Sequence, residues 1–254
     1  MVEQALLTAY YRTFILNVLN CAANSSGGPA AMRSVVVPGQ LSASLLGCER
    51  DQRTLFDSLS FTLDAGQLYW IEGPNGSGKT TLLKILSGQF SDYRGTLHWQ
   101  GQPVGHHAQA LRADLLYLGH QSGVKGSLSA LENLAWYQAL GTSRQADPEQ
   151  ARWQALEKSG LAGFEDVPVE RLSAGQQRRV ALARLHMEPR ALWILDEPFT
   201  AIDKSGVAQL EGWISEHRDN GGSVVVTTHH PLTLDGGVGH IRLDGLGGHR
   251  VEAA

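Results

Sequence analysis

Residues 73–80 read G-P-N-G-S-G-K-T, a glycine-rich string that ends in a lysine and a threonine. Glycines let the backbone turn tightly and point several N–H groups at one anion. Lys79 would reach the phosphates as a mobile positive charge, and Thr80 would offer its hydroxyl to Mg²⁺. A glycine-rich turn without a ligand would need neither side chain. The string therefore predicts nucleotide binding by Gly73, Pro74, Asn75, Gly76, Ser77, Gly78, Lys79, Thr80 and Thr81.

A second string, L-W-I-L-D-E at residues 192–197, places two carboxylates directly after four apolar residues. Asp196 would hold Mg²⁺ through its water shell, because Mg²⁺ gives up water reluctantly. Glu197 would orient and polarise an attacking water. An isolated Asp-Glu pair is more typical of a helix cap or a solvated turn, but this pair shares its chain with a phosphate-binding string. Together the two strings predict a P-loop NTPase, which leaves kinases, GTPases and motor ATPases open.

A third string, L-S-A-G-Q at residues 172–176, opens a predicted helix shortly before Asp196. Ser173 and the N–H groups around Gly175 would form a second anion site at the helix N-terminus. A serine that merely caps an ordinary helix is the alternative, but it does not explain why the string lies between the other two. The three strings in this order resemble the ATP-binding cassette family, with Ala174 in place of the commoner glycine.

The resemblance covers nearly all of residues 41–243 and implies roles for further residues. In the family, the site at Ser173 and Gly175 faces the γ-phosphate held by a second copy of the chain. Gln121 matches the residue that contacts the metal and relays to a membrane subunit, and Asp203 matches an aspartate at the dimer seam.

The resemblance also assigns the switch histidine, which contacts the γ-phosphate, to His229, with His230 as the second choice. Where the family stacks an aromatic side chain on adenine, this chain has Arg50, whose planar guanidinium also stacks on a flat ring. The predicted catalytic residues are Glu197, His229, Gln121 and Lys79, and the predicted Mg²⁺ site is Thr80, Gln121 and Asp196.

The elements that must position these residues alternate between strands and helices from Leu41 onward. Short apolar runs flanked by turns predict parallel strands buried on both faces. The expected strands are residues 59–63, 68–72, 95–99, 115–118, 192–195 and 224–228, and the expected helices are 80–86, 129–140, 148–159 and 174–187. The resemblance implies an α/β, P-loop NTPase fold of the cassette type, with a mixed-sheet core, a small antiparallel β subdomain and a helical lobe that carries the signature.

The N-terminal part of the chain differs in character from the rest. Residues 24–31 are rich in Ser, Gly and Pro, so we expect residues 1–40 to form a loose extension outside a single cassette domain at 41–254. Polar residues interrupt the apolar run at 5–23, which falls short of the roughly 18 residues of a spanning helix. The run also lacks a basic leader, which disfavours a signal peptide.

Composition limits the classes of partner. The formal net charge of −4 gives no support to a nucleic-acid surface, which usually needs a concentrated basic face. Cys21 and Cys48 stand far apart without metal-ligand spacing, which favours two reduced thiols. The expected cofactors are ATP and Mg²⁺, and the expected partners include a second copy of the chain and no nucleic acid.

Longer strings at residues 48–56, 117–125, 128–134 and 160–169 resemble one branch of the family, the ATP-binding subunits of the bacterial haem exporter of cytochrome c maturation. This resemblance implies ATP-driven haem export or release of haem from its carrier. It also implies a peripheral position on the cytoplasmic face of the inner membrane, with the membrane subunit CcmB and with CcmC and CcmD. No haem-attachment string is present, so the haem link rests on resemblance alone.

Two other classes of protein compete with this interpretation. A soluble cassette ATPase that is not coupled to transport usually carries a long coiled coil or two cassettes, and this sequence has neither. A P-loop kinase for small molecules would lack the L-S-A-G-Q string.

Overall fold

The computed structural model describes residues 39–105, 108–140, 147–187 and 189–254, which belong to one compact unit. Most of the predicted extension at residues 1–40 lies outside these ranges, as does Cys21. The domain boundary at residue 41 therefore stays a prediction. Cys48 is buried as a free thiol. No helix in the described ranges is both long enough and apolar enough to cross a lipid bilayer.

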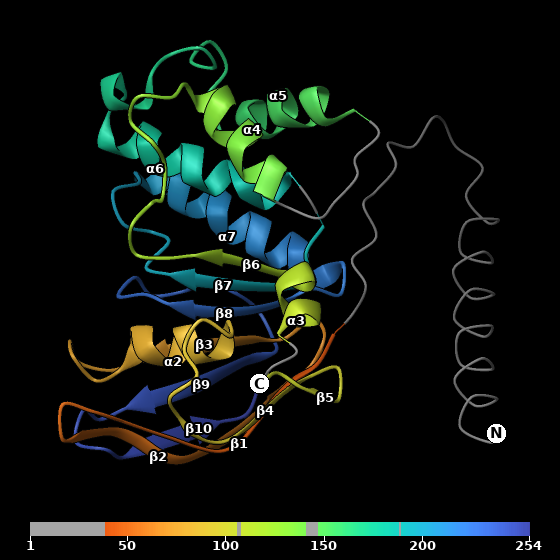
Figure 1. The fold of residues 1–254 in the computed structure, drawn as a ribbon. Coiled ribbons are helices and arrows are strands. Elements are labelled where there is room, and N and C mark those ends of the chain that lie inside the picture. Colours follow the sequence, from red (N-terminus) through yellow and green to blue (C-terminus); the bar gives the residue numbers. More distant parts are fainter. Residues whose placement is uncertain (1–38, 106–107, 141–146, 188) are drawn as a thin grey trace, which may run out of the picture. The chain divides into compact units, whose positions relative to one another are not determined.

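Within the described residues, six strands form the central sheet in the order β10-β9-β3-β8-β7-β6 (Figure 1). The pairs β9–β3, β3–β8, β8–β7 and β7–β6 are parallel, and β10 pairs antiparallel with β9, so the sheet is mixed as expected. Every residue of β7 and β8 is buried, because packed elements cover both faces of these strands. The strands are β3 (Leu68–Glu72), β6 (Leu115–Leu118), β7 (Leu192–Asp196), β8 (Ser223–Thr227), β9 (Val238–Leu243) and β10 (His249–Glu252).

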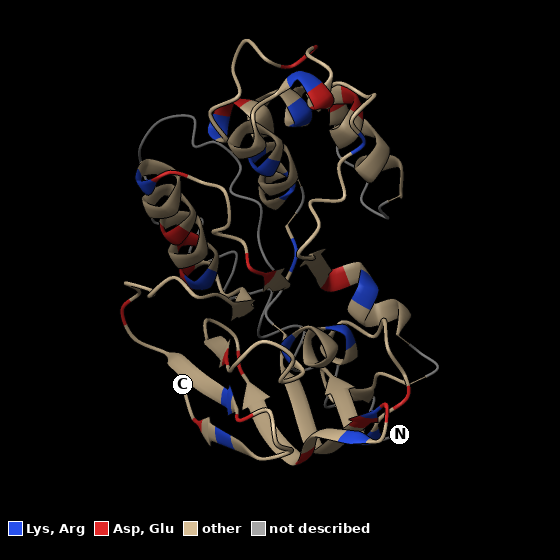
Figure 2. Ribbon diagram, turned by 90° about the vertical axis from the view of Figure 1, so that its left-hand side faces the viewer, with Lys and Arg blue, Asp and Glu red and all other residues tan. Residues whose placement is uncertain are grey.

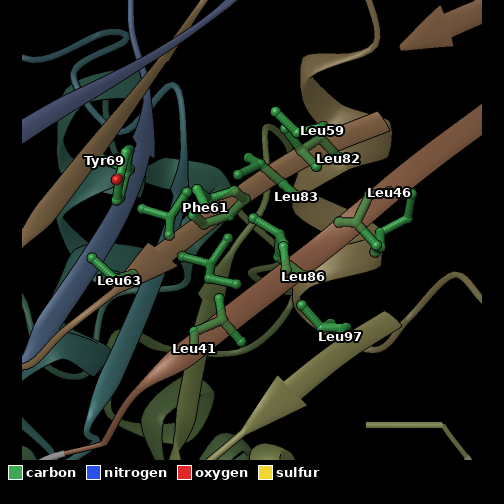
Figure 3. Packing of buried hydrophobic residues seen from close by; sticks show 14 of the residues in the cluster. Leu41, Leu46, Leu59, Phe61, Leu63, Tyr69, Leu82, Leu83, Leu86 and Leu97 are labelled. Atoms are coloured by element: carbon green, nitrogen blue, oxygen red, sulfur yellow. The ribbon is translucent and has the colours of Figure 1, made fainter. Parts of the chain in front are cut away.

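A second, antiparallel sheet has the strand order β2-β1-β4-β5. Its strands are β1 (Leu41–Arg50), β2 (Arg53–Leu63), β4 (Arg94–Trp99) and β5 (Gln102–Pro103). Helix α2 (Lys79–Leu86) lies between the two sheets, with Leu82, Leu83 and Leu86 fully buried against leucines of β1 and β2 (Figures 1 and 3). Each such leucine stabilises the fold by about 1.5–3 kcal/mol through burial. The packing therefore fixes the N-terminus of α2 at one edge of the core.

The remaining helices other than α3 cover the other face of the central sheet and build a lobe with its own apolar cluster, whereas α3 packs in the same cluster as α2. Buried Asn133 ties this lobe together, because its amide binds the backbone of Lys125 and Ser129. Helix α5 begins as predicted, with Pro148 in its first turn and the Asp147 side chain accepting from the N–H of Gln150. The helices are α3 (Gln109–Asp114), α4 (Ala130–Leu140), α5 (Pro148–Lys158), α6 (Ala174–Leu182) and α7 (Lys204–Asp219).

The helix expected at residues 174–187 was wrong at its C-terminal end. Helix α6 stops at Leu182 and continues as the 3₁₀ turn η2 (Ala183–His186). In this tighter turn the Arg184 guanidinium carbon lies 3.8 Å from the centre of the Tyr137 ring. The His186 ring meets the Trp213 ring edge-on at 4.4 Å between centroids. These tertiary contacts accompany the change of helix type, for which the local sequence carries no signal.

Charged residues of both signs are interspersed over the helices and the two sheets (Figure 2). Neighbouring charges pair at short range, as Arg94 does with Asp57 and Arg242 with Glu252, each at 2.9 Å. Exposed pairs of this kind contribute only about 0–1 kcal/mol each. The fold therefore depends on its apolar clusters and on buried polar groups.

Two histidines, the buried His217 and the half-buried His186, make the stability of the fold dependent on pH. The His217 ring stacks on Trp193 with 3.8 Å between centroids and is 6% exposed. Burial lowers the pKa of His217 and of His186 from 6.5 to about 4. The unfolded chain binds these protons below about pH 6.5 and the folded chain does not. The stability that these two neutral histidines contribute is therefore fully present above about pH 6.5 and is lost as the pH falls towards 4.

We expect Tm to fall between pH 7 and pH 4.5, with His217 contributing on the order of 3 kcal/mol of the loss. His217→Phe keeps a ring against Trp193 but cannot bind a proton, so its Tm should fall less steeply with acidification. Thermal melts of both proteins across this pH range make the comparison. Identical slopes would contradict a role for His217 in acid sensitivity.

Candidate functional site

The phosphate-binding string forms the predicted turn between β3 and α2. Gly73 has a φ of 150°, and a Cβ there would stand 2.4 Å from the carbonyl oxygen of Leu243, so only glycine fits. Gly78, at φ 100°, is the N-cap of α2 and provides no side-chain hydrogen bond. The first N–H groups of α2 therefore remain available to an anion, at the positive end of the helix dipole.

Two polar side chains of this loop, those of Lys79 and Ser77, point into it. Lys79 Nζ donates to the carbonyl oxygen atoms of Gly73, at 2.6 Å, and Pro74, at 3.2 Å. Ser77 is 1% exposed, and its Oγ is buried without a hydrogen-bond partner in the structure. Buried hydroxyl groups are normally paired. The loop thus forms a concave site that contains the unpaired Ser77 hydroxyl, with the Lys79 ammonium group at its edge.

The threonine of the loop and the first carboxylate meet across two elements. Thr80, in the first turn of α2, donates from Oγ1 to Asp196 Oδ2 at 3.1 Å. Thr227, at the end of β8, donates from Oγ1 to Asp196 Oδ1 at 2.6 Å. Asp196 is 3% exposed at the C-terminal end of β7. The fold therefore brings together the hydroxyl and the carboxylate that were predicted to hold Mg²⁺.

Glu197 and His229, two of the predicted catalytic residues, also lie side by side. The N–H of Glu197 bonds to the carbonyl oxygen and to Oγ1 of Thr227, both at 3.0 Å, which fixes its main chain. The Glu197 carboxylate accepts from the N–H of His229 at 3.4 Å and lies 3.6 Å from His229 Nε2. The indole N–H of Trp70 donates to the carbonyl oxygen of Thr228 at 3.1 Å and holds the segment before His229.

The side chains of Lys79, Thr80, Asp196, Glu197 and His229 line one cleft of about 870 Å³, a volume in the range of small-molecule sites. The predicted residue Arg50 lines the cleft, and its guanidinium carbon lies 5.6 Å from the centre of the Phe90 ring. Gln121 is exposed and does not line the cleft, whereas its neighbour His120 does. The lining residues are Arg50, Asp51, Arg53, Leu55, Asn75, Gly76, Gly78, Lys79, Thr80, Thr81, His120, Asp196, Glu197, Thr200 and His229.

The signature residues line a different hollow, of about 390 Å³, together with Asp203. Ser173 caps α6, because its Oγ accepts from the N–H of Gln176 at 3.3 Å while Gln176 Oε1 accepts from the N–H of Ser173 at 2.9 Å. Gly175 also lines this hollow. One chain therefore carries the two predicted anion sites in separate hollows, and the structure does not bring Ser173 and Gly175 to Lys79.

Asp203 begins α7 and pairs across the signature hollow with Arg179 at 3.0 Å. Hydrogen bonds from the Ser205 hydroxyl and the Gly206 N–H lower the pKa of Asp203, and Arg179 adds to this effect. Its carboxylate is thereby held ionised at the start of the helix, where the dipole also favours negative charge.

Sequence reasoning missed Arg178. Its guanidinium is buried, 6% exposed, and bonds to the backbone that carries the predicted metal ligand Asp196 and the predicted base Glu197. The available signal was helical spacing, because Arg178 lies four residues before buried Leu182 and so shares its face of α6. An arginine on the apolar face of a helix normally needs specific partners.

Residues 56–200 match the profile of the ABC transporter family. The chain belongs to that family. The matched range of this ABC protein contains the phosphate loop, the signature and the carboxylate strand, so the predicted family and its P-loop fold are confirmed.

Among curated relatives are two proteins with the name cytochrome c biogenesis ATP-binding export protein CcmA. The one from Pseudomonas putida KT2440 is 54% identical over 192 residues, which cover 76% of this ABC protein and 90% of the relative. The one from Escherichia coli K12 is 52% identical over 196 residues, which cover 77% and 92%.

Solved structures agree on the fold. The cassette MJ0796, in a dimeric post-hydrolysis state with ADP and phosphate, superposes with a TM-score of 0.74 at 21% identity and covers 84% of this chain and 98% of its own. An ATP-binding subunit of another ABC transporter gives a TM-score of 0.73 at 21% identity, with 83% and 89% covered.

Proposed function

We propose that this chain is the ATP-hydrolysing subunit of a bacterial ABC exporter of cytochrome c biogenesis, where it powers haem export or the release of haem from its chaperone. The observation that carries the proposal is the convergence of Lys79, Thr80, Asp196, Glu197 and His229 on one cleft. The export role is inferred from the names of the CcmA relatives.

The cleft fits a nucleoside triphosphate with its magnesium ion. Mg²⁺ prefers hard oxygen ligands, and the Thr80 hydroxyl and Asp196 carboxylate supply them 3.1 Å apart. When bound, Mg²⁺ would neutralise charge on the β- and γ-phosphates. The loop N–H groups and Lys79 would bind the phosphate oxygens, and the buried Ser77 hydroxyl would gain a partner. Gln121 follows His120 of the cleft wall and remains a proposed contact to the metal.

Hydrolysis needs a water molecule in line with the γ-phosphorus. Glu197 accepts a proton from that water as its oxygen forms a bond to phosphorus, and the bond from the γ-phosphorus to the bridging oxygen breaks. The products are ADP and inorganic phosphate. His229 lies against the Glu197 carboxylate and is the proposed γ-phosphate contact that reports hydrolysis to the chain.

The base end of the cleft carries guanidinium groups from β1 and β2. Arg50 lies near Phe90, and Arg53 donates to the carbonyl oxygen of Gly245. A guanidinium offers a flat face, and Arg50 is therefore the proposed stacking partner of adenine. Leu55 supplies apolar contact beside it.

The second anion site requires a second copy of the chain. Ser173 and Gly175 line a hollow separate from the phosphate loop, so neither surface alone can surround a γ-phosphate. We propose a dimer in which ATP lies between the phosphate loop of one chain and the signature of the other, with Asp203 at the seam. Such a sandwich couples hydrolysis to opening of the pair.

The proposed membrane partner is CcmB, in an assembly with CcmC and CcmD on the cytoplasmic face of the inner membrane. The test captures the full tagged chain from bacterial membranes in mild detergent. We expect an integral membrane protein of the CcmB type to co-purify, with Mg-ATP hydrolysis in the eluate. In cells, Glu197→Gln should abolish haem attachment to c-type cytochromes.

A fully active chain recovered alone from the supernatant, with normal cytochromes in Glu197→Gln cells, would support the other candidate, an ABC ATPase uncoupled from transport. Glu216→Gln serves as the matched control, because Glu216 is an exposed residue of α7 outside the cleft. It should leave co-purification and cytochrome maturation unchanged.

A further inference from the structure

Arg178 connects the helix of the signature to the backbone of the catalytic carboxylates. Its Nε donates to the carbonyl oxygen of Pro198 at 3.2 Å. A terminal nitrogen of the same guanidinium donates to the carbonyl oxygen of Glu197 at 2.7 Å and lies 3.5 Å from that of Asp196. One side chain thus spans three consecutive residues that follow the buried strand β7.

This arrangement is costly for the fold unless the contacts are made. Burial lowers the pKa of Arg178, and the negative charges of Asp196 and Glu197 oppose that effect. A buried charge needs hydrogen-bond partners, and an apolar side chain of similar length would avoid the cost of desolvation. The planar guanidinium has several donors in fixed directions, which neither lysine nor glutamine reproduces.

The backbone that Arg178 binds is in an unfavourable conformation. Glu197 has a φ of 49°, although it is not a glycine. Such conformations persist only where neighbouring contacts hold them. Thr227 binds the N–H of Glu197 from β8, and Arg178 binds its carbonyl oxygen from α6. The position of the Glu197 carboxylate therefore depends on α6.

The N-terminal end of α6 is the signature. Ser173 caps this short helix and lines the hollow that would face the nucleotide of a partner chain. We infer that Arg178 is a positioning residue that holds Glu197 for hydrolysis and links it to the signature of the same chain. Nucleotide that the partner chain holds contacts the signature of this chain. Its effect passes through α6 and Arg178 to Glu197, at this chain's own site of hydrolysis. This inference rests on the proposed ATP sandwich.

The experiment uses the full chain, with its membrane partner where the capture supplies one. Arg178→Met removes the donors and the charge, Arg178→Lys keeps the charge, and Arg178→Gln keeps one amide. Arg94→Met is the matched control, because Arg94 makes an exposed ion pair with Asp57 and does not line the cleft. Each protein is tested for binding of a fluorescent ATP analogue, kcat, and the Hill coefficient for ATP.

For Arg178→Met we expect analogue affinity within about threefold of wild type and a kcat lower by roughly 10–100-fold, because a small displacement of a catalytic group is that costly. The Hill coefficient should fall from above 1 towards 1. Arg178→Lys should recover part of kcat, and Arg94→Met should match wild type in all three measurements.

Wild-type kcat and cooperativity in a folded Arg178→Met chain would overturn the inference, as would a loss of kcat matched by an equal loss of affinity. A wild-type Hill coefficient of 1 would remove the link between sites. If Arg178→Met and Arg178→Gln do not fold, normal kcat and cooperativity in folded Arg178→Lys would overturn the inference. Failure of the proposed function differs, because wild type itself would then neither bind nor hydrolyse Mg-ATP.

Discussion

Replacing Glu197 by glutamine is expected to slow ATP hydrolysis by roughly 10²–10⁴-fold while ATP binding survives. The amide has nearly the same shape as the carboxylate but cannot take a proton from water. The main-chain bonds of residue 197 to Thr227 and Arg178 do not involve its side chain, so the loop should keep its conformation. Phosphate release measures the loss, and titration with a fluorescent ATP analogue measures binding.

The same variant should accumulate as a nucleotide-bound dimer, because ATP that is not hydrolysed keeps bridging the two chains. Size-exclusion chromatography with and without Mg-ATP detects that species. Exposed Glu216 provides the control substitution to glutamine, with wild-type turnover and no trapped dimer. Near-normal turnover in Glu197→Gln would exclude Glu197 as the general base.

Mixing two inactive variants is expected to restore ATPase activity. Lys79→Ala removes the cation of the phosphate loop, so alone it should lose hydrolysis and most ATP affinity. Ser173→Arg fills the signature hollow and removes the cap of α6, so alone it should also be inactive. A mixed dimer combines both lesions in one composite site and leaves the other site intact.

An equal mixture should recover up to roughly a quarter of wild-type activity if chains pair at random and sites work independently. Phosphate release is followed after mixing, with dimerisation confirmed separately. A flat baseline in confirmed mixed dimers would mean that hydrolysis requires two intact sites. Full activity of Ser173→Arg alone would contradict the shared site, and hydrolysis by Lys79→Ala alone would contradict the phosphate-loop assignment.

Short-range patterns predicted much of the fold. The expected strands at residues 68–72 and 115–118 match β3 and β6, because a buried strand in a parallel sheet is a compact apolar run. The sequence did not predict the hairpin of β9 and β10 or the separate helix α7. Glycines precede the hairpin and fill much of its loop, and its register depends on pairing with β3, far away in sequence.

The candidate site likewise contains some residues that local sequence patterns predict and others that only the tertiary structure reveals. The phosphate loop, Asp196 and Glu197 were predicted because their spacing is local and each residue type has one chemical use. Arg178 was missed, because its partners are carbonyl groups about twenty residues away, and backbone carbonyls carry no residue-type signal. The separation of Ser173 from Lys79 into two hollows also depends on tertiary structure, although the resemblance implied it.

The left-handed backbone conformation at Glu197 lowers the stability of the fold at a position whose side chain is needed for activity. Glycine, and to a lesser degree asparagine, adopts that conformation more readily than glutamate, by about 1–2 kcal/mol. Selection for thermal resistance alone would therefore favour replacing Glu197, and the more stable chains obtained would be poor catalysts. Variants chosen for robustness need an ATPase screen alongside the melting temperature.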